Sequence, residues 1–243
     1  MDAVIVKDLS YQYWPEGPQV LKNISFQAAR GEMLVITGLS GCGKSTLCYC
    51  LSGIAGHRRD AVMQGQVLVN GKDVRGLRAA SLALEAGMVF QDPDTQLFSP
   101  SVEDEIAFGP ENLCLPPDEI RARVDQVLDL LDISSLIKAN PYHLSGGEKH
   151  LVALAAVLAL DPPVLILDEV MSRLDRHGVM RVTEVLQTLR NAGKTIIAVE
   201  HRLETVTFAD RLMVMEKGAL LRWGTTKNIL ADQEFLAAQH LLD

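Results

Sequence analysis

The sequence has few of the features that mark secreted, membrane-spanning or nucleic-acid-binding proteins. Only four cysteines occur among 243 residues, and they form no paired C-x-x-C framework, so disulfides and zinc are not expected. The longest apolar run, Leu151 to Leu160, is too short to cross a bilayer, and no basic segment leads into an apolar run at the N-terminus. The net charge of −8 argues against a nucleic-acid partner. These features predict a soluble chain in a reducing cytoplasm.

One stretch, Gly38 to Ser45, fits the pattern G-x-x-x-x-G-K-[ST] of a phosphate-binding loop. An apolar segment expected to be a strand, Met33–Thr37, precedes it, and a helix is expected to continue through Leu51. Glycines allow several backbone N–H groups to point at one anion, and the helix N-terminus adds its positive dipole end. Lys44 is expected to reach the β- and γ-phosphates, and Ser45 to ligate Mg²⁺. The alternative, a glycine-rich turn that binds nothing, is disfavoured because every required position is filled.

Two further apolar strands are expected to end in polar residues suited to triphosphate chemistry. The run 164–167 leads into Asp168 and Glu169, and the run 195–199 leads into Glu200 and His201. Ligands of open α/β sheets bind at such strand ends. Asp168 can hold Mg²⁺ directly or through water, Glu169 can activate the attacking water, and His201 can contact the γ-phosphate. A solvated strand end and a structural histidine are the alternative interpretations.

The remaining pattern predicts two strand-rich halves that flank a helical block. Strands are expected over 3–13, 20–28, 67–72, 87–91, 211–215 and 220–223, and helices over 101 onward, 119–131, 149–160, 176–191 and from 225. Ser145 is a candidate helix N-cap. Cys48 and Cys50 are expected to pack in the core. Tyr13 is favoured to stack on an adenine ring, with a plain sheet-edge position as the alternative.

Several motifs in fixed order make the chain resemble an ABC-transporter ATPase over essentially its whole length. They are the P-loop, Gln91, Leu144-Ser145-Gly146-Gly147-Glu148, Asp168-Glu169, Ser172-Arg173-Leu174-Asp175 and His201. The resemblance implies an α/β P-loop NTPase (RecA-like) core with an N-terminal antiparallel β subdomain and an inserted α-helical subdomain. Residues 1–243 then form one domain, with the core and β subdomain at 1–91 and 162–243 and the helical insertion at 92–161.

The resemblance also implies the site residues and the cofactors ATP and Mg²⁺. Catalysis is expected from Glu169, His201, Gln91 and Lys44, and Mg²⁺ binding from Ser45, Gln91 and Asp168. ATP contacts are expected from Tyr13, Gly38, Leu39, Ser40, Gly41, Cys42, Gly43, Lys44, Ser45 and Thr46. Ser145, Gly146 and Gly147 are expected to contact the ATP that a second ATPase subunit holds, so that two subunits pair head to tail.

Three segments, 91–98, 101–110 and 199–204, are similar to the ATPases of energy-coupling factor (ECF) importers. This similarity implies an identical or non-identical ATPase partner, a transmembrane coupling protein and a substrate-binding membrane protein, with the ATPase at the cytoplasmic face of the membrane. The cargo would be a vitamin or a transition metal ion. The alternatives are an ATPase of another ABC transporter class, a non-transport ABC protein of translation or DNA repair, and a P-loop kinase or GTPase.

The chain departs from the family pattern at three places, of which Arg173 is expected near the subunit interface. Glu148 replaces a Gln, Val170 replaces a Pro, and Met171-Ser172-Arg173 is an unusual approach to Asp175. They indicate either one member of an asymmetric pair or a divergent active subunit. The end of the chain soon after Trp223 fits a short family member or one half of a tandem protein.

Overall fold

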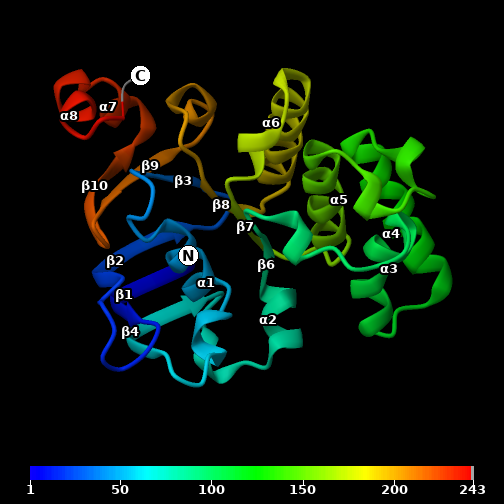
Figure 1. Cartoon of the computed structure of the whole chain (residues 1–243), viewed down its shortest axis with the longest axis horizontal. Coiled ribbons are helices and arrows are strands. Elements are labelled where there is room, and N and C mark those ends of the chain that lie inside the picture. The colour runs from blue at the N-terminus through cyan, green and yellow to red at the C-terminus, as the bar shows by residue number, and fades with distance from the viewer. Residues whose placement is uncertain (242–243) are drawn as a thin grey trace.

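Two β-sheets that lie against each other form the centre of the fold (Figure 1). The computed structural model describes residues 1–241, apart from the side chain of Glu204; residues 242–243, the end of the predicted domain, lie outside the described part. The first sheet has the order β2-β1-β4-β5 and consists of β1 (Asp2–Gln12), β2 (Leu21–Ala29), β4 (Val62–Val69) and β5 (Lys72–Asp73). The second has the order β10-β9-β3-β8-β7-β6 and consists of β3 (Met33–Thr37), β6 (Ala86–Val89), β7 (Val164–Asp168), β8 (Thr195–Val199), β9 (Arg211–Glu216) and β10 (Ala219–Thr225).

The central strands of the second sheet are parallel. β3 pairs with β8, β8 with β7 and β7 with β6 in parallel register, so their carboxyl ends share one edge of the sheet. The P-loop follows β3, Asp168 and Glu169 stand at the end of β7, and His201 follows β8. The predicted α/β fold is confirmed, and this topology brings segments more than 100 residues apart in sequence to one edge.

β3 separates two hydrophobic cores, because successive strand side chains point to opposite faces. Met33 and Val35 pack in a core with buried residues of the segments 102–107, 124–133, 152–159 and 182–186. Leu34 and Ile36 pack in another core with the first sheet and the helix α1 (Lys44–Leu51), where Cys48 and Cys50 are fully buried as predicted. Burial on both faces explains the continuous apolar run of this strand.

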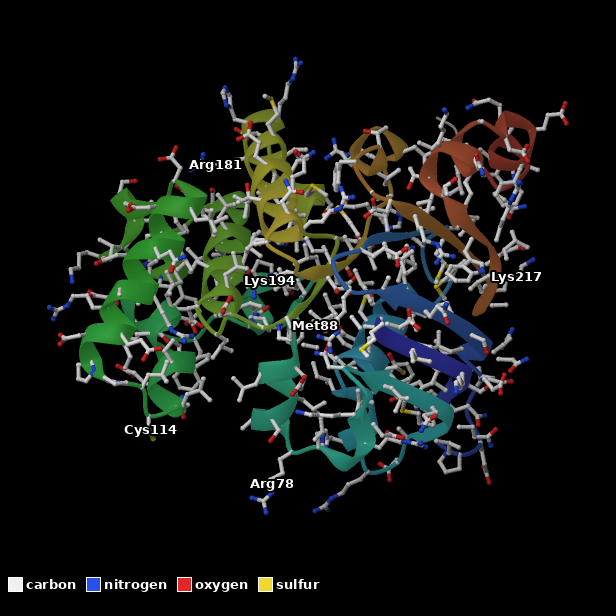
Figure 2. The ribbon with its side chains drawn as sticks, turned by 180° about the vertical axis from the view of Figure 1, so that it is seen from behind. Arg78, Met88, Cys114, Arg181, Lys194 and Lys217 are labelled. Carbon is white, nitrogen blue, oxygen red and sulfur yellow. The ribbon has the colours of Figure 1, made fainter. Side chains whose placement is uncertain are left out.

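The helices that follow α1 lie on both faces of the parallel sheet: the first packs in the core of Leu34 and Ile36, and the others pack in the core of Met33 and Val35. They are α2 (Ala79–Glu85), α3 (Val102–Asn112), α4 (Pro117–Leu131), α5 (Gly146–Leu158), α6 (Arg176–Asn191), α7 (Thr226–Leu230) and α8 (Gln233–Ala238). α3, α4 and α5 pack together as a group at one end of the molecule (Figure 1). Met88 on β6 lies between this group and α2, near the centre of the opposite view (Figure 2). No helix in residues 1–241 is long and apolar enough to cross a membrane.

Most element bounds agree with the sequence pattern, and the differences have local causes. α5 begins at Gly146 rather than at 149 because Ser145 is its N-cap. β4 begins five residues before the predicted start, where its side chains are only half-buried and give no apolar pattern. α2 was not predicted, because only Leu82 within it is buried and the segment shows no helical period of apolar residues.

Candidate functional site

The P-loop has a backbone that requires glycine at two positions. Gly38 has φ +145°, and a Cβ there would lie 2.3 Å from the carbonyl oxygen of Met215. Gly43 has φ +104° as the N-cap of α1, and a Cβ there would lie 3.1 Å from the Val20 carbonyl oxygen. This geometry leads the chain from β3 into α1 with the helix N-terminus directed at the loop, an arrangement suited to an anion.

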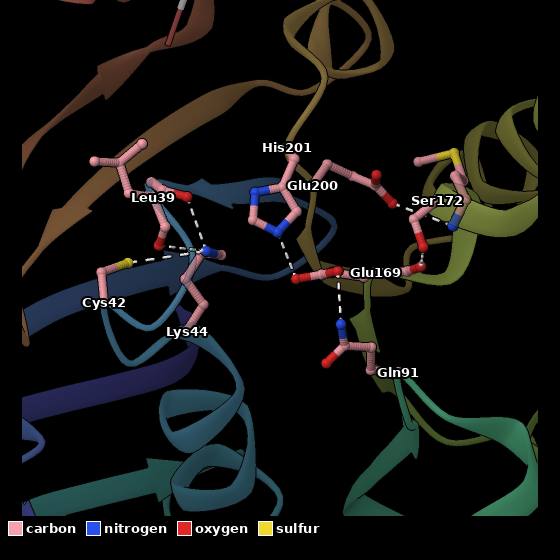
Figure 3. Close-up of polar contacts among 10 residues, drawn as sticks. Leu39, Cys42, Lys44, Gln91, Glu169, Ser172, Glu200 and His201 are labelled. Atoms are coloured by element: carbon pink, nitrogen blue, oxygen red, sulfur yellow. Dashed lines mark hydrogen bonds and ion pairs between the residues drawn. The ribbon is translucent and has the colours of Figure 1, made fainter. Parts of the chain in front are cut away.

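Lys44 lies across the P-loop and is only 4% exposed. Its Nζ donates to the carbonyl oxygens of Gly38 (2.8 Å) and Leu39 (3.0 Å), and the Cys42 Sγ lies 3.9 Å away (Figure 3). An ammonium group has three N–H donors, so the lysine is held in place while charge remains directed into the loop. A hollow of about 220 Å³ opens beside it and is lined by Val20, Ser40, Gly41, Gly43, Lys44, Ser45, Thr46, Gln91 and Glu169.

Tyr13 is attached to the first turn of α1. Its hydroxyl lies 2.9 Å from the Thr46 Oγ1, and its ring meets the edge of the Tyr11 ring at 5.1 Å. The Arg58 guanidinium lies over the Tyr13 ring at 5.2 Å from its centroid. The structure therefore places a fixed aromatic ring next to the P-loop helix, although Tyr13 follows a strand in the other sheet. Neither Thr46 as a partner of Tyr13 nor Arg58 as its cation follows from any sequence pattern, because 33 and 45 residues separate them from Tyr13.

Asp168 is a buried carboxylate whose polar neighbour, the Ser45 hydroxyl, does not form a hydrogen bond of standard geometry with it. It is fully buried, and among residues 1–241 neither of its carboxylate oxygens makes a hydrogen bond of standard geometry. Burial raises the pKa of Asp168 to about 6, with Glu169 acting in the same direction and the Ser45 hydroxyl opposing it. An unpartnered carboxylate beside a hydroxyl fits Mg²⁺, which prefers hard oxygen ligands and typically takes one or two carboxylates plus phosphate oxygens. The described residues include no cluster of three or more His, Cys, Asp or Glu side chains that could hold a metal ion by themselves.

Glu169 joins two other predicted site residues in one network (Figure 3). The Gln91 Nε2 donates to its Oε2 at 2.9 Å, and the His201 Nε2 lies 2.5 Å from its Oε1. Glu169 has φ +55°, which turns the chain sharply after β7 and directs this side chain toward the hollow beside Lys44. Residues 91, 169 and 201, predicted from three separate motifs, thus meet at one point.

The predicted signature residues lie apart from this network. Ser145, Gly146 and Gly147 line a different groove, which shares no lining residue with the hollow beside the P-loop. Ser145 and Glu148 form a capping box: the Ser145 backbone N–H and hydroxyl donate to the Glu148 Oε2 at 2.8 and 2.7 Å, and the Glu148 N–H donates to the Ser145 Oγ at 3.3 Å. These reciprocal bonds satisfy the open N–H groups at the start of α5.

The sequence did not indicate that both residues flanking His201 contact Met171. The Met171 N–H faces the Glu200 Oε1 at 3.4 Å, and the Arg202 Nη2 donates to the Met171 carbonyl oxygen at 3.3 Å. Glu200 is only 3% exposed. The pattern V-E-H-R showed two charged residues at a strand end, but nothing in it revealed that one of them is buried.

A buried Asp and a Glu bonded to Gln91 and His201, at the edge of a parallel sheet next to a P-loop, define a P-loop nucleotide-binding protein of the α/β class. The sequence profile of the ABC transporter family matches residues 21–172. The chain belongs to this family and is an ABC-type ATPase.

Individual relatives agree with this assignment. An energy-coupling factor transporter ATP-binding protein EcfA of Methanosarcina acetivorans is 41% identical over 228 residues, which cover 93% of this chain and 81% of that protein. A putative ABC transporter ATP-binding protein of Methanosarcina mazei is 41% identical over 96% of this chain, which spans only 40% of that longer protein. The solved structure of cbiO1 from Clostridium perfringens, part of the ABC transporter complex cbiONQ, has a TM-score of 0.83 and 37% identity, with coverage of 98% of this chain and 94% of that chain.

Proposed function

We propose that this chain is the ATPase subunit of an ECF-type importer, and that it hydrolyses ATP as one member of a head-to-tail pair. The observation that carries the proposal is that the hollow beside the P-loop and the groove that contains Ser145 are separate surfaces of one chain. ATP bound at the P-loop contacts the hollow near Gln91 and Glu169, whereas Ser145 faces a groove with no residue in common with it. A second subunit in inverted orientation brings the two surfaces together over each ATP.

In the proposed reaction the chain's own groups position the triphosphate and the water. Lys44 and the α1 N-terminus bind the β- and γ-phosphates, and the Tyr13 ring supports the adenine. Ser45, Asp168 and Gln91 are the residues that would hold Mg²⁺, which neutralises charge on the phosphate oxygens when it is bound. Glu169 accepts a hydrogen bond from the attacking water, and His201 and Gln91 fix its carboxylate.

In the same proposal the chain consists of a nucleotide-binding core and an inserted helical subdomain. Residues 1–91 and 162–243 carry the nucleotide site. Residues 92–161 form a helical subdomain that carries Ser145 to Glu148, which we call the signature surface. An apolar groove of about 260 Å³ lies between these parts, lined in part by Leu82, Met88, Phe90, Val157 and Leu160. We propose it as the place where the transmembrane coupling protein docks, with the ATPase at the cytoplasmic face. The cargo, a vitamin or a transition metal ion, is selected by the membrane subunits.

The test of pairing uses Glu169→Gln, which keeps the shape of the site but removes the carboxylate that orients water. Light scattering with and without Mg-ATP is expected to show a monomer that becomes a dimer only with ATP. Adding Ser145→Arg is expected to abolish the dimer and to leave ATP binding by the monomer intact. Unchanged hydrolysis by Glu169→Gln would refute the role of Glu169, and loss of monomer ATP binding by Ser145→Arg would refute the contact across the interface.

Membrane docking is tested separately by co-purification of the tagged chain with detergent-extracted membrane proteins from its own host. Ala83→Arg places a charge at the groove edge between α2 and β6 without touching the P-loop. We expect this variant to bind and hydrolyse ATP normally and to lose the membrane protein. Recovery of RNA or DNA instead would favour a non-transport ABC protein.

A further inference from the structure

The signature surface and the segment after Glu169 form the two walls of one groove. Its volume is about 880 Å³, and it includes Ser145 to Glu148 on one side and Arg173 to Asp175 on the other. A Cβ added at Gly146 would lie 4.0 Å from the Arg173 Cδ, and one added at Gly147 would lie 3.5 Å from the Leu174 Cδ2. The Arg173 side chain therefore lies beside Gly146, and Leu174 lies beside Gly147, so the two walls of the groove are close together.

Most charged side chains in this groove are acidic. Asp132, Glu148, Asp175 and Glu184 are all in its lining. Hydrogen bonds from Ser145 lower the pKa of Glu148, so its carboxylate is ionised at neutral pH. A groove of this composition repels a triphosphate unless a cation compensates for it.

The Ser145 hydroxyl cannot supply the missing attraction while the capping box is intact. Its single proton is donated to the Glu148 Oε2 at 2.7 Å. Two arginines share the groove, and the Arg181 Nη2 is bonded to the Asp129 carbonyl oxygen at 3.1 Å. Within residues 1–241, the Arg173 side chain makes no hydrogen bond or ion pair, and it is exposed.

We infer that Arg173 binds the terminal phosphates of the ATP held by a second copy of this chain, and offsets the charge of Glu148 there. The inference rests on the proposed head-to-tail pairing. A guanidinium group presents several N–H donors in one plane and suits phosphate oxygens. Two departures from the family pattern are then explained together. The positive charge of Arg173 compensates for the negative charge of Glu148.

The position of Arg173 is coupled to the hydrolysis site. Glu200 and Arg202, on either side of His201, contact the N–H and carbonyl of Met171, two residues before Arg173. The Ser172 hydroxyl donates to the Glu169 carbonyl oxygen at 2.7 Å. The segment that carries Arg173 is therefore attached to both Glu169 and the strand end that bears His201, so closure over the partner's phosphates acts on the residues that handle the chain's own ATP.

The test measures the ATP concentration that gives half-maximal dimer in the Glu169→Gln background. Arg173→Met is expected to raise this concentration about tenfold, and Arg173→Lys by less because it keeps the charge. Glu148→Gln is expected to lower it about fivefold, since glutamine still completes a capping box but removes the negative charge. Arg121→Met, which removes an exposed arginine on α4 outside the groove, serves as the matched control and is expected to have no effect.

A second readout separates binding across the interface from damage to the chain's own site. The affinity of the isolated monomer for ATP, measured at protein concentrations below those of dimer formation, is expected to be equal in all variants. A dimer whose ATP dependence is unaffected by Arg173→Met would overturn this inference alone. A parent Glu169→Gln protein that forms no ATP-dependent dimer would overturn the proposed pairing of two copies, and this inference with it.

Discussion

Glu200 offers a direct test of the electrostatics around the site, because it is a carboxyl group buried beside two others. It follows the last residue of β8 and is only 3% exposed. Burial above all raises the pKa of Glu200 from 4.5 to about 8; Glu169 and Asp168 add to the rise, whereas the Met171 N–H and Arg202 oppose it. The folded protein therefore keeps a proton on this group at neutral pH.

The sign of the effect on stability follows from the proton count. Between pH 4.5 and about 8 the unfolded chain has released this proton and the folded chain has not, so the free energy of unfolding falls as pH rises. The slope is at most about 1.4 kcal/mol per pH unit. From pH 5 to pH 8 the loss therefore approaches about 4 kcal/mol, and it ceases once the folded group has also ionised. Glu200→Gln removes this contribution because glutamine does not titrate.

The assay is urea unfolding of the wild type and of Glu200→Gln at pH 5, 6, 7 and 8, with the difference in unfolding free energy plotted against pH. We expect the unfolding free energy of the variant, relative to that of the wild type, to rise by up to about 4 kcal/mol from pH 5 to pH 8. Glu148→Gln is the matched control: its carboxyl has a lowered pKa and is mostly ionised in both states from pH 5 upward, so its difference is expected to be nearly flat. Parallel curves for the wild type and Glu200→Gln would refute the buried, protonated state of Glu200.

Two further predictions concern nucleotide binding. Because burial raises the pKa of Asp168 to about 6, Mg-ATP affinity measured by calorimetry is expected to fall by up to about tenfold per pH unit below pH 6, as protonation removes the Mg²⁺ ligand. Asp168→Asn is expected to abolish this pH dependence, whereas an unaltered profile would exclude Asp168 as the titrating group. Tyr13→Ala is expected to weaken ATP binding by roughly 1–3 kcal/mol through loss of stacking, and Tyr13→Phe to retain most of the affinity despite losing the bond to Thr46. Equal losses in the two variants would show that the hydroxyl, rather than the ring, matters.

The extent to which the structure could be predicted depended on whether a motif was local. β3, α6 and β8 have the predicted bounds because each is a short apolar run or a capped amphipathic helix, whose signals lie within the element. The meeting of Gln91, Glu169 and His201 was also foreseeable, since parallel strands of one sheet bring their carboxyl ends to one edge. The bond between Tyr13 and Thr46 was not, because it joins two sheets through packing that no periodicity encodes.

Glu148 shows that comparison with the family pattern alone can miss the local role of a residue. Compared with the family pattern it is a departure from Gln, but the spacing S-x-x-E also predicts a capping box, which the structure contains. The local rule explains why a glutamate is tolerated at this position: it stabilises the start of α5 as well as glutamine would. The negative charge also interacts favourably with the N-terminal end of the α5 dipole, and in the pair that we propose it faces the partner's ATP.

The hydrogen bonds of the site indicate how Mg-ATP binding changes the chain. Lys44 is bonded to two P-loop carbonyls, and Glu169 is bonded to Gln91 and His201. Phosphates and water must therefore compete with bonds that the chain already makes, which keeps the net gain from each of these groups small. Asp168 is the exception, since among the described residues its buried oxygens make no hydrogen bond of standard geometry and burial raises its pKa. A cation that arrived with the nucleotide would relieve the cost of this buried charge, which supports our proposal that the chain binds the metal-bound form of ATP rather than free ATP.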